Sequence, residues 1–324
     1  MAEETGLADY GSILDGFDGE GFLDGLIRDA IRASVGPGVI SDLAFVLLTV
    51  LLIAAARTVF GPPVGAFDGA ALAGASAVML LLSGKQNSLT AMAEATIWKL
   101  QDAANALLPI LSSAAVMSGQ FTSAAAKYSA AALFLNLLVN LCCGFVLPLI
   151  RLYLAAAAAE AAVGGGLMSG VLGFLKWCGA TALSCLMLAF TLYLSLTALA
   201  ANTADAAIVR SAKTAVSAML PVVGSIAGDA ASSLLAAAGM IRQAVGSFGL
   251  MAVSSILLTP FLRTGVRYLL LKGASAVSAE LAEGRMSLLL KRLSESMALL
   301  MGSLGSCALM MFFSVYSFMR TVNL

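Results

Sequence analysis

Four long stretches without a single charged residue constrain the fold of this chain more than any other feature. They cover residues 128–150, 177–204, 243–262 and 296–319, and none of them contains Asp, Glu, Lys or Arg. About 20 apolar residues in a helix cross the hydrocarbon core of a bilayer, and these runs are longer than ordinary buried helices of soluble domains. The sequence therefore predicts an all-α, polytopic helical membrane protein.

The composition excludes several classes of function. Of the 324 residues, 60% are hydrophobic and 11% are charged, against about 25% charged residues in soluble domains. The chain has no histidine, which removes the commonest general base and the commonest ligand of transition metals. It also has no P-loop and no basic patch interleaved with aromatic residues. We therefore expect no enzyme activity, no cofactor and no binding of nucleic acid.

The cysteines do not indicate a disulfide framework or a metal cluster. All five lie inside apolar runs, without a C-x-x-C pair: Cys142, Cys143, Cys178, Cys185 and Cys307. Cysteines in such surroundings are typically small buried hydrophobic residues.

Charge divides the chain into two parts. Residues 1–30 carry eight acidic side chains and one basic side chain. The pattern over 21–34 predicts an amphipathic helix, which either lies at the membrane surface or packs on its own protein. We therefore assign residues 1–38 to an acidic head with an interfacial helix, and residues 39–324 to a membrane domain. Because the first residues lack the basic start of a signal peptide, we expect the first apolar run to act as its own insertion signal, or the chain to begin near a processed end.

Basic residues gather in the C-terminal third of the chain. Residues 263–292 carry six basic and two acidic side chains. The positive-inside tendency places this segment in the cytoplasm, and the acidic head is then expected on the opposite side of the membrane.

We expect about six to nine membrane segments, including short broken or re-entrant helices. The clearest are 39–56, 128–150, 177–200, 243–262 and 296–319, and weaker ones are 69–84, 103–126 with Pro109, 152–175, and the broken-helix region 201–242. Residues 85–102 are polar and are expected to form an exposed loop and helix. The pieces 214–228 and 230–241 are each too short to cross a bilayer, so they predict a broken helix that the rest of the protein shields.

Two ionisable residues in weak membrane segments are candidate functional residues. Glu160 and Asp229 each either line a polar path or pair with a base from another helix, or else lie in a wet loop between short helices. Asn136 and Asn140 are four residues apart and share a helix face, which favours helix or subunit packing over a substrate contact. Pro221, Gly224 and Gly228 precede Asp229. We expect these four residues to form a break at a pore or subunit contact.

The last third of the chain resembles a known family. The features are Ala204-Asp205-Ala206, the basic turn Arg210-Ser-Ala-Lys213, Leu220-Pro221-Val222-Val223-Gly224, Gly228-Asp229-Ala230, and Ile241-Arg242-Gln243-Ala244-Val245-Gly246. Val146-Leu147-Pro148-Leu149-Ile150 adds an earlier match. This order resembles the stage III sporulation protein AE family of endospore-forming bacteria, over about residues 20–322.

The resemblance implies a role in an assembly. The family belongs to a channel complex across the two membranes between mother cell and engulfed forespore, which forespore development requires after engulfment. It implies a multi-pass subunit in the mother-cell membrane facing the forespore, which forms homo-oligomers in the lipid bilayer. The implied partners are the other stage III sporulation operon proteins, including a secretion-type ATPase, and a YidC-type insertase for assembly.

A stand-alone secondary transporter or permease is the alternative function. It predicts an internal inverted repeat with paired interrupted helices, and the segments around Pro109 and Pro221 are the candidates for that pair. An intramembrane enzyme is a third and less favoured hypothesis, because no paired carboxylates or activated nucleophile can be recognised.

Overall fold

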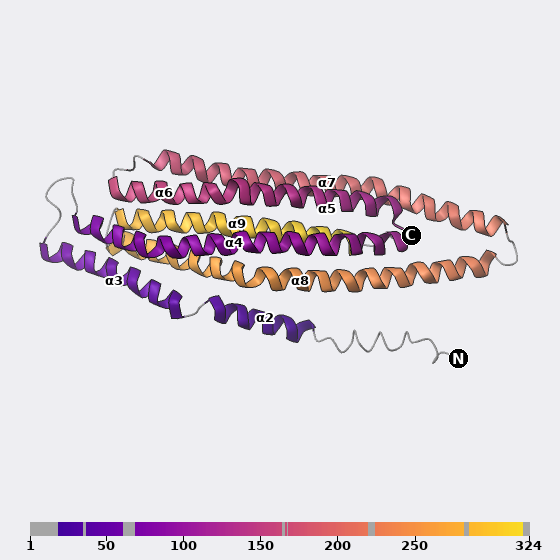
Figure 1. Ribbon diagram of the computed structural model, residues 1–324, viewed down its shortest axis with the longest axis horizontal. Coiled ribbons are helices and arrows are strands. Elements are labelled where there is room, and N and C mark those ends of the chain that lie inside the picture. The colour runs from indigo at the N-terminus through magenta and orange to yellow at the C-terminus, as the bar shows by residue number, and fades with distance from the viewer. Residues whose placement is uncertain are drawn as a thin grey trace.

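Nearly parallel helices form one elongated bundle, as the computed structural model shows (Figure 1). The structure describes residues 19–34, 37–60, 69–163, 166, 168–219, 224–281 and 285–319. Within these ranges the regular elements are helices and no strand occurs. The predicted all-α class is therefore confirmed.

The helices of the described residues lie along the length of the bundle. After α2 (Gly19–Ser34), they are α3 (Pro37–Phe60), α4 (Gly69–Met117), α5 (Phe121–Leu141), the π-helical segment η1 (Cys142–Val146), α6 (Leu147–Val163), α7 (Ser169–Met219), α8 (Gly224–Leu281) and α9 (Arg285–Met319). The segment η1 joins α5 to α6 without a turn, so these three elements run as one long rod.

Several helices are much longer than a bilayer is thick. Helices α4, α7 and α8 contain 49, 51 and 58 residues, which corresponds to about 75–85 Å at 1.5 Å per residue. Each therefore continues well beyond a hydrocarbon core of about 30 Å. Helix α4 also runs unbroken through Pro109, and the kink or break predicted within 103–126 is found as the turn between Met117 of α4 and Phe121 of α5.

Four helical stretches among the described residues are long and apolar enough to cross a membrane. They are Phe121–Ala161, Ser169–Leu196, Ser233–Glu280 and Met286–Met319, and Ala44–Ala55 is a shorter apolar stretch. This confirms the polytopic helical class, with fewer stretches than the six to nine predicted. Part of the difference arises because segments that the sequence separates at Arg151 and at Arg242 belong to continuous helices.

The break predicted within 201–242 does not lie at Asp229, since α7 ends at Met219 and α8 begins at Gly224. Helix α8 begins at Gly224 and continues through Gly228 and Asp229 to Leu281, so 214–228 and 230–241 are not separate short helices. One glycine and one aspartate cost an α-helix only about 1 kcal/mol each, which a 58-residue helix tolerates. Pro221 lies outside the described residues. The role of these four residues at a pore or subunit contact stays a prediction.

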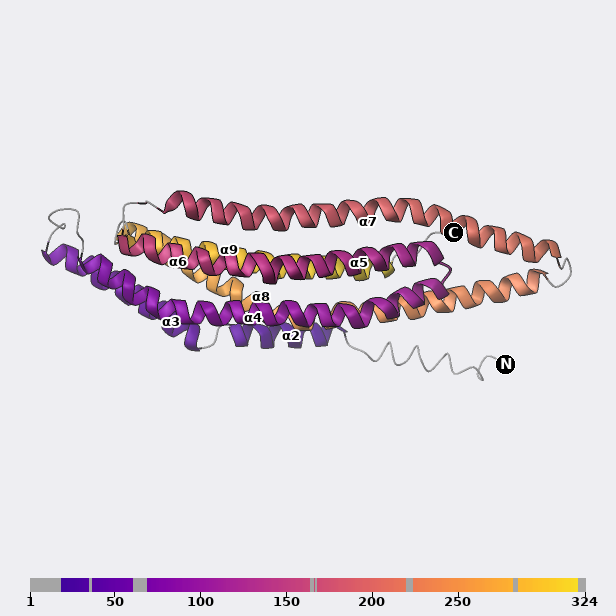
Figure 2. The same ribbon diagram turned by 45° about the horizontal axis from the view of Figure 1, so that its top comes forward.

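The two ends of the bundle differ in shape. At one end, the last part of α7 and the first part of α8 extend past the other helices, as both views show (Figures 1 and 2). Helix α2 packs along α8 and buries Ala30. Of the two arrangements that the sequence leaves open for this helix, packing on its own protein is observed, while its interfacial role stays a prediction.

Contacts between helices place the uncharged runs at one level of the bundle. A methyl group added at Gly179 of α7 would lie 3.5 Å from both Leu149 of α6 and Leu299 of α9. Further along, the sulfur atoms of Cys142 and Cys307 are 3.9 Å apart. The runs 128–150, 243–262 and 296–319 contain 20 to 24 residues, or about 30–36 Å of helix. Side by side, they match the thickness of one bilayer.

The uncharged runs, lying side by side, form what we call the apolar slab of the bundle. One side of this slab is covered with aliphatic side chains. Leu133 and Leu137 on α5 are 62% and 49% exposed, and Leu188 and Leu192 on α7 are 64% and 62% exposed. Helices α5 and α7 pack against each other, so these leucines form a continuous apolar surface. A surface of this kind contacts lipid tails or another apolar protein face.

Candidate functional site

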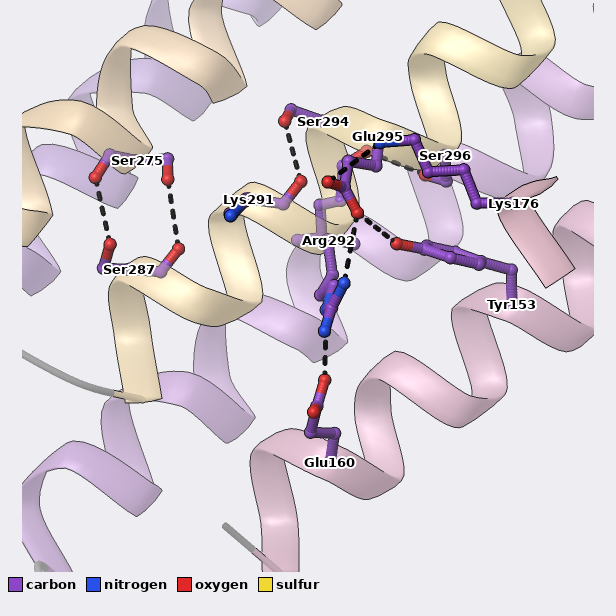
Figure 3. A network of polar contacts seen from close by, with 11 residues as sticks. Tyr153, Glu160, Lys176, Ser275, Ser287, Lys291, Arg292, Ser294, Glu295 and Ser296 are labelled. Atoms are coloured by element: carbon purple, nitrogen blue, oxygen red, sulfur yellow. Dashed lines mark hydrogen bonds and ion pairs between the residues drawn. The ribbon is translucent and has the colours of Figure 1, made fainter. Parts of the chain in front are cut away.

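A network of charged side chains lies at one edge of the apolar slab, between α6, α7 and α9. Arg292 of α9 donates from Nε to Glu160 Oε2 of α6 at 3.2 Å and from Nη1 to Glu295 Oε2 at 3.3 Å. Tyr153 donates to Glu295 Oε2 at 2.6 Å, and Lys176 Nζ of α7 lies 3.1 Å from Glu295 Oε1. The side chains converge from the three helices (Figure 3).

Burial makes the ion pair between Glu160 and Arg292 the central contact of this network. The Glu160 side chain is 1% exposed and that of Arg292 is 13% exposed, whereas Lys176 is 45% exposed. Glu160 Oε1 has no hydrogen-bond partner. Two buried charges are costly to remove from water, so each depends on the other for compensation.

Helical spacing explains how the sequence brings these groups together. Tyr153 and Glu160 are seven residues apart, two turns along one face of α6, and Arg292 and Glu295 are three residues apart on one face of α9. The two helices run in opposite directions (Figure 1). Tyr153 therefore meets Glu295 at the slab edge, and Glu160 meets Arg292 beyond it.

Further polar contacts at this end tie α4 and α8 to the same group of helices. Gln86 of α4, 2% exposed, donates to the Leu293 carbonyl at 3.4 Å and to the Ser296 hydroxyl. Glu94 of α4 pairs with Arg151 of α6 at 3.0 Å. Ser275 of α8 and Ser287 of α9 exchange hydrogen bonds with each other's carbonyl groups (Figure 3). This end of the bundle is thus locked by side chains from α4, α6, α7, α8 and α9.

The chemistry of this network is structural. Its two acids and two bases balance, and each base contacts an acid at 3.1–3.3 Å. The described residues contain no group of three or more Cys, Asp and Glu side chains that could hold a metal ion. What the geometry does provide is a joint between α6, α7 and α9 whose parts are held by charge.

The structure places the two predicted asparagines at the centre of the slab. Asn140 Nδ2 donates to the carbonyl and to Oδ1 of Asn136, at 3.0 and 3.2 Å, and Gln101 Nε2 of α4 donates to Asn136 Oδ1 at 3.4 Å. Both asparagines are exposed. The amides therefore link α4 to α5 and also face outward, and their role as pore or subunit contacts stays a prediction.

A second buried cation lies at the opposite edge of the slab. Arg242 of α8 is 0% exposed and donates from Nη1 to Ser118 Oγ, in the α4–α5 turn, at 3.0 Å. Its Nε and Nη2 atoms have no hydrogen-bond partner, and no described carboxylate lies within ion-pairing distance. In the sequence, Arg242 belongs to the motif Ile241-Arg242-Gln243-Ala244-Val245-Gly246, and nothing in that motif predicts a role for its side chain.

Sequence reasoning found one member of the charge network and missed the others. Of the two alternatives for Glu160, pairing with a base from another helix is the one observed. Arg292, Glu295 and Lys176 lie at the ends of apolar runs, where they read only as span boundaries, and Tyr153 carried no signal. The one available clue was the single carboxylate within an Ala-rich segment, which requires a cation.

The cysteines vary in exposure. Cys142 and Cys307 are buried, as expected, but Cys185 is exposed on α7. Its place beside Leu188, in an apolar run, puts this thiol on the aliphatic side of the slab.

Comparison with known proteins identifies the family of this chain. The family model for stage III sporulation protein AE matches residues 33–321, which includes all of the helices that form the slab and the charge network. No curated protein and no solved structure matches the chain. The match covers well over half of the 324 residues, so the chain belongs to the stage III sporulation protein AE family.

Proposed function

We propose that this protein is a membrane subunit of a channel or export complex that links mother cell and forespore, and that forespore development requires it after engulfment. Membership of the family supports a sporulation role, and the four membrane-capable stretches support a place in a membrane. The subunit lies in the mother-cell membrane facing the forespore and acts without catalysis of its own.

The exposed amides of Asn136 and Asn140 carry the proposal that the protein works in an assembly. Asn136 lies nine residues after Lys127 and fifteen before Arg151, or about 14 and 22 Å from the charged ends of its run. Amides at this depth are unfavourable against lipid tails, and in membrane proteins they bond to a neighbouring helix. Helix α5 therefore offers a contact for a second copy of the chain or for another subunit.

The partners follow from the family and from what the chain lacks. The sequence has no P-loop, so we propose that a secretion-type ATPase from the same operon supplies energy. The remaining stage III sporulation operon proteins complete the channel, and a YidC-type insertase assists insertion. The sequence contains no recognisable binding motif for any of these partners. Each interaction therefore needs a test of its own.

The stand-alone transporter remains the alternative, but the long helices do not favour it. A secondary transporter of the inverted-repeat type needs interrupted helices around its substrate site. Helix α4 is continuous through Pro109, and α8 is continuous from Gly224. A pair of broken helices in corresponding positions is therefore not found among the residues that the structure describes.

Deletion of the gene tests the proposed role. We expect cells without the gene to grow normally before sporulation. During sporulation, we expect the forespore to shrink and a late forespore reporter to stay inactive after engulfment. Normal spores, or a defect in growing cells, would contradict the proposal and favour the transporter.

Replacement of the amides tests the assembly contact. The double variant Asn136→Leu/Asn140→Leu should keep normal protein levels in the membrane but lose most of the late reporter signal and most of the oligomer on native gels. Asn87→Leu is the matched control. Asn87 is also exposed, but it lies nearer the start of α4 than Gln101, which contacts Asn136. An oligomer that survives the double variant unchanged would place the contact elsewhere.

A further inference from the structure

One face of α4 carries exposed polar side chains through the apolar slab. Lys99, Asp102 and Asn105 are all exposed and follow each other at intervals of three residues, which keeps them on one side of the helix. They differ from the charge network because neither Lys99 nor Asp102 lies at the end of the bundle.

The depth of these side chains follows from contacts between helices. Gln101, next to Asp102, bonds to Asn136 in the middle of the uncharged run of α5. On the other side, Leu107 lies beside Gly249 of α8, where an added methyl group would be 3.5 Å away. Gly249 is the seventh residue of the uncharged run 243–262. Both neighbours therefore place Asp102 well inside the slab and away from its edges.

Exposed charges at this depth cannot face lipid tails. Charged side chains within membrane segments face the interior of an assembly or a water-filled cavity, because transfer into hydrocarbon is costly. On α5 and α7 the exposed positions of the slab include Leu133, Leu137, Leu188 and Leu192. The slab thus has an aliphatic side on α5 and α7, whereas the exposed face of α4 carries Lys99, Asp102 and Asn105 together with Trp98 and Ile110.

Helix α2 adds charge along the same length of the bundle. Both views place α2 beside the middle of α8, which packs against α4 (Figures 1 and 2). Arg28 and Asp24 of α2 form an exposed ion pair, with side chains 75% and 70% exposed. The exposed faces of α4 and α2 therefore both carry charges that need contact with water. They lie at the same level of the bundle as the exposed leucines of α5 and α7, which suit contact with lipid.

We propose that the α4 face formed by Lys99, Asp102 and Asn105 lines a water-filled path within the membrane assembly. Because the face carries one base, one acid and one amide, it suits hydrated polar solutes of either charge sign. The amides of Asn136 and Asn140, at the edge of this face, then lie where the neighbouring subunit closes the path. This inference gives the proposed channel its lining, but it depends on the slab and not on the sporulation role.

Thiol accessibility in membranes tests the proposal. Asp102→Cys and Asn105→Cys are made in the full chain, and permeabilised membrane vesicles are treated with a small, charged, membrane-impermeant methanethiosulfonate. Native Cys185 is the internal control, because it is exposed on the aliphatic side. Since the reagent attacks only a hydrated thiolate, we expect labelling at positions 102 and 105 at least about tenfold faster than at Cys185.

The outcomes separate the alternatives. Slow labelling at both positions, equal to that of Cys185, would overturn the proposal, because the face would then lie against lipid or protein. Equal and fast labelling of Cys185 would overturn it too, since the slab would not be in lipid. The two α4 variants are read together with Leu188→Cys, so that the loss of one variant to misfolding leaves a decisive comparison. A normal sporulation phenotype after gene deletion would contradict the proposed function. It would not affect the labelling result for the α4 face.

Discussion

Arg292 of α9 reaches 3.2 Å from Glu160 of α6, and the pair is almost closed to water. The contact joins residues 132 positions apart in the sequence. It brings a base from the cationic segment 263–292 to the carboxylate of an Ala-rich helix. Glu295 is the second acid of this group, and it binds Arg292, Lys176 and Tyr153. Removal of one member therefore leaves a specific partner uncompensated.

Arg292→Met is expected to destabilise the protein strongly. The change leaves Glu160 buried without a cation, at a cost of roughly 2–4 kcal/mol, below the full value for a wholly buried pair because Arg292 keeps some contact with water. The measurement is the thermal unfolding midpoint of the purified protein in detergent.

The double variant Arg292→Met/Glu160→Leu provides the control for this prediction. Because it removes both charges together, it should recover most of the lost stability. Two independent losses that simply add would show that the ion pair has no coupling, and the network would lose its role as a joint.

Arg242→Met is expected to behave in the opposite way. Arg242 is buried at the other edge of the slab, with two donor atoms unpartnered and one bond to Ser118. An apolar side chain of similar length removes a desolvated charge without leaving a carboxylate behind. We expect the unfolding midpoint to stay the same or to rise, whereas a fall as large as that of Arg292→Met would mean that an anion compensates Arg242 in the working protein.

Gln86→Leu should cost about 1–2 kcal/mol of stability. The Gln86 amide is buried and donates to both Leu293 and Ser296, so the change removes two hydrogen bonds between α4 and α9. Asn87→Leu is the neighbouring control, since Asn87 is exposed and surface substitutions stay within about 0.5 kcal/mol. Equal unfolding midpoints for the two variants in detergent would contradict the role assigned to Gln86.

Sequence reasoning predicted the class of this fold because hydrophobic burial in a bilayer depends on composition. The uncharged runs of α5, α7, α8 and α9 can be recognised from the sequence alone. The lengths of the helices cannot, because a residue such as Asp229 or Pro109 is tolerated inside a helix when packing on neighbours outweighs its local cost. Charged residues in the sequence therefore predict helix ends at positions where the helices in fact continue.

The candidate site was predictable only in part, for a related reason. Glu160 stood out as a lone carboxylate, and Asn136 and Asn140 as amides on one face. Their partners come from distant segments, so nothing local identifies Arg292 or Gln101. The polar segment 85–102 was expected to be an exposed loop and helix. It is exposed in part, but it belongs to α4, whose register with α5 and α8 carries Lys99 and Asp102 into the slab.

Gly246→Ala and Gly239→Ala form a matched pair on α8 that tests the packing of the end of α9 against α8. A methyl group at Gly246 would lie 2.7 Å from the Met319 sulfur and closer still to Met319 Cγ, whereas nothing lies within 4 Å of Gly239. Since Met319 must move or α9 must shift, Gly246→Ala should cost about 1–3 kcal/mol. Gly239→Ala should instead gain up to about 1 kcal/mol, because alanine favours the helix. Both are measured as unfolding midpoints in the same detergent. If Gly246→Ala proves as stable as Gly239→Ala, the last turn of α9 does not pack against α8 in solution, and the register that sets the depth of the slab would have to be revised at this end.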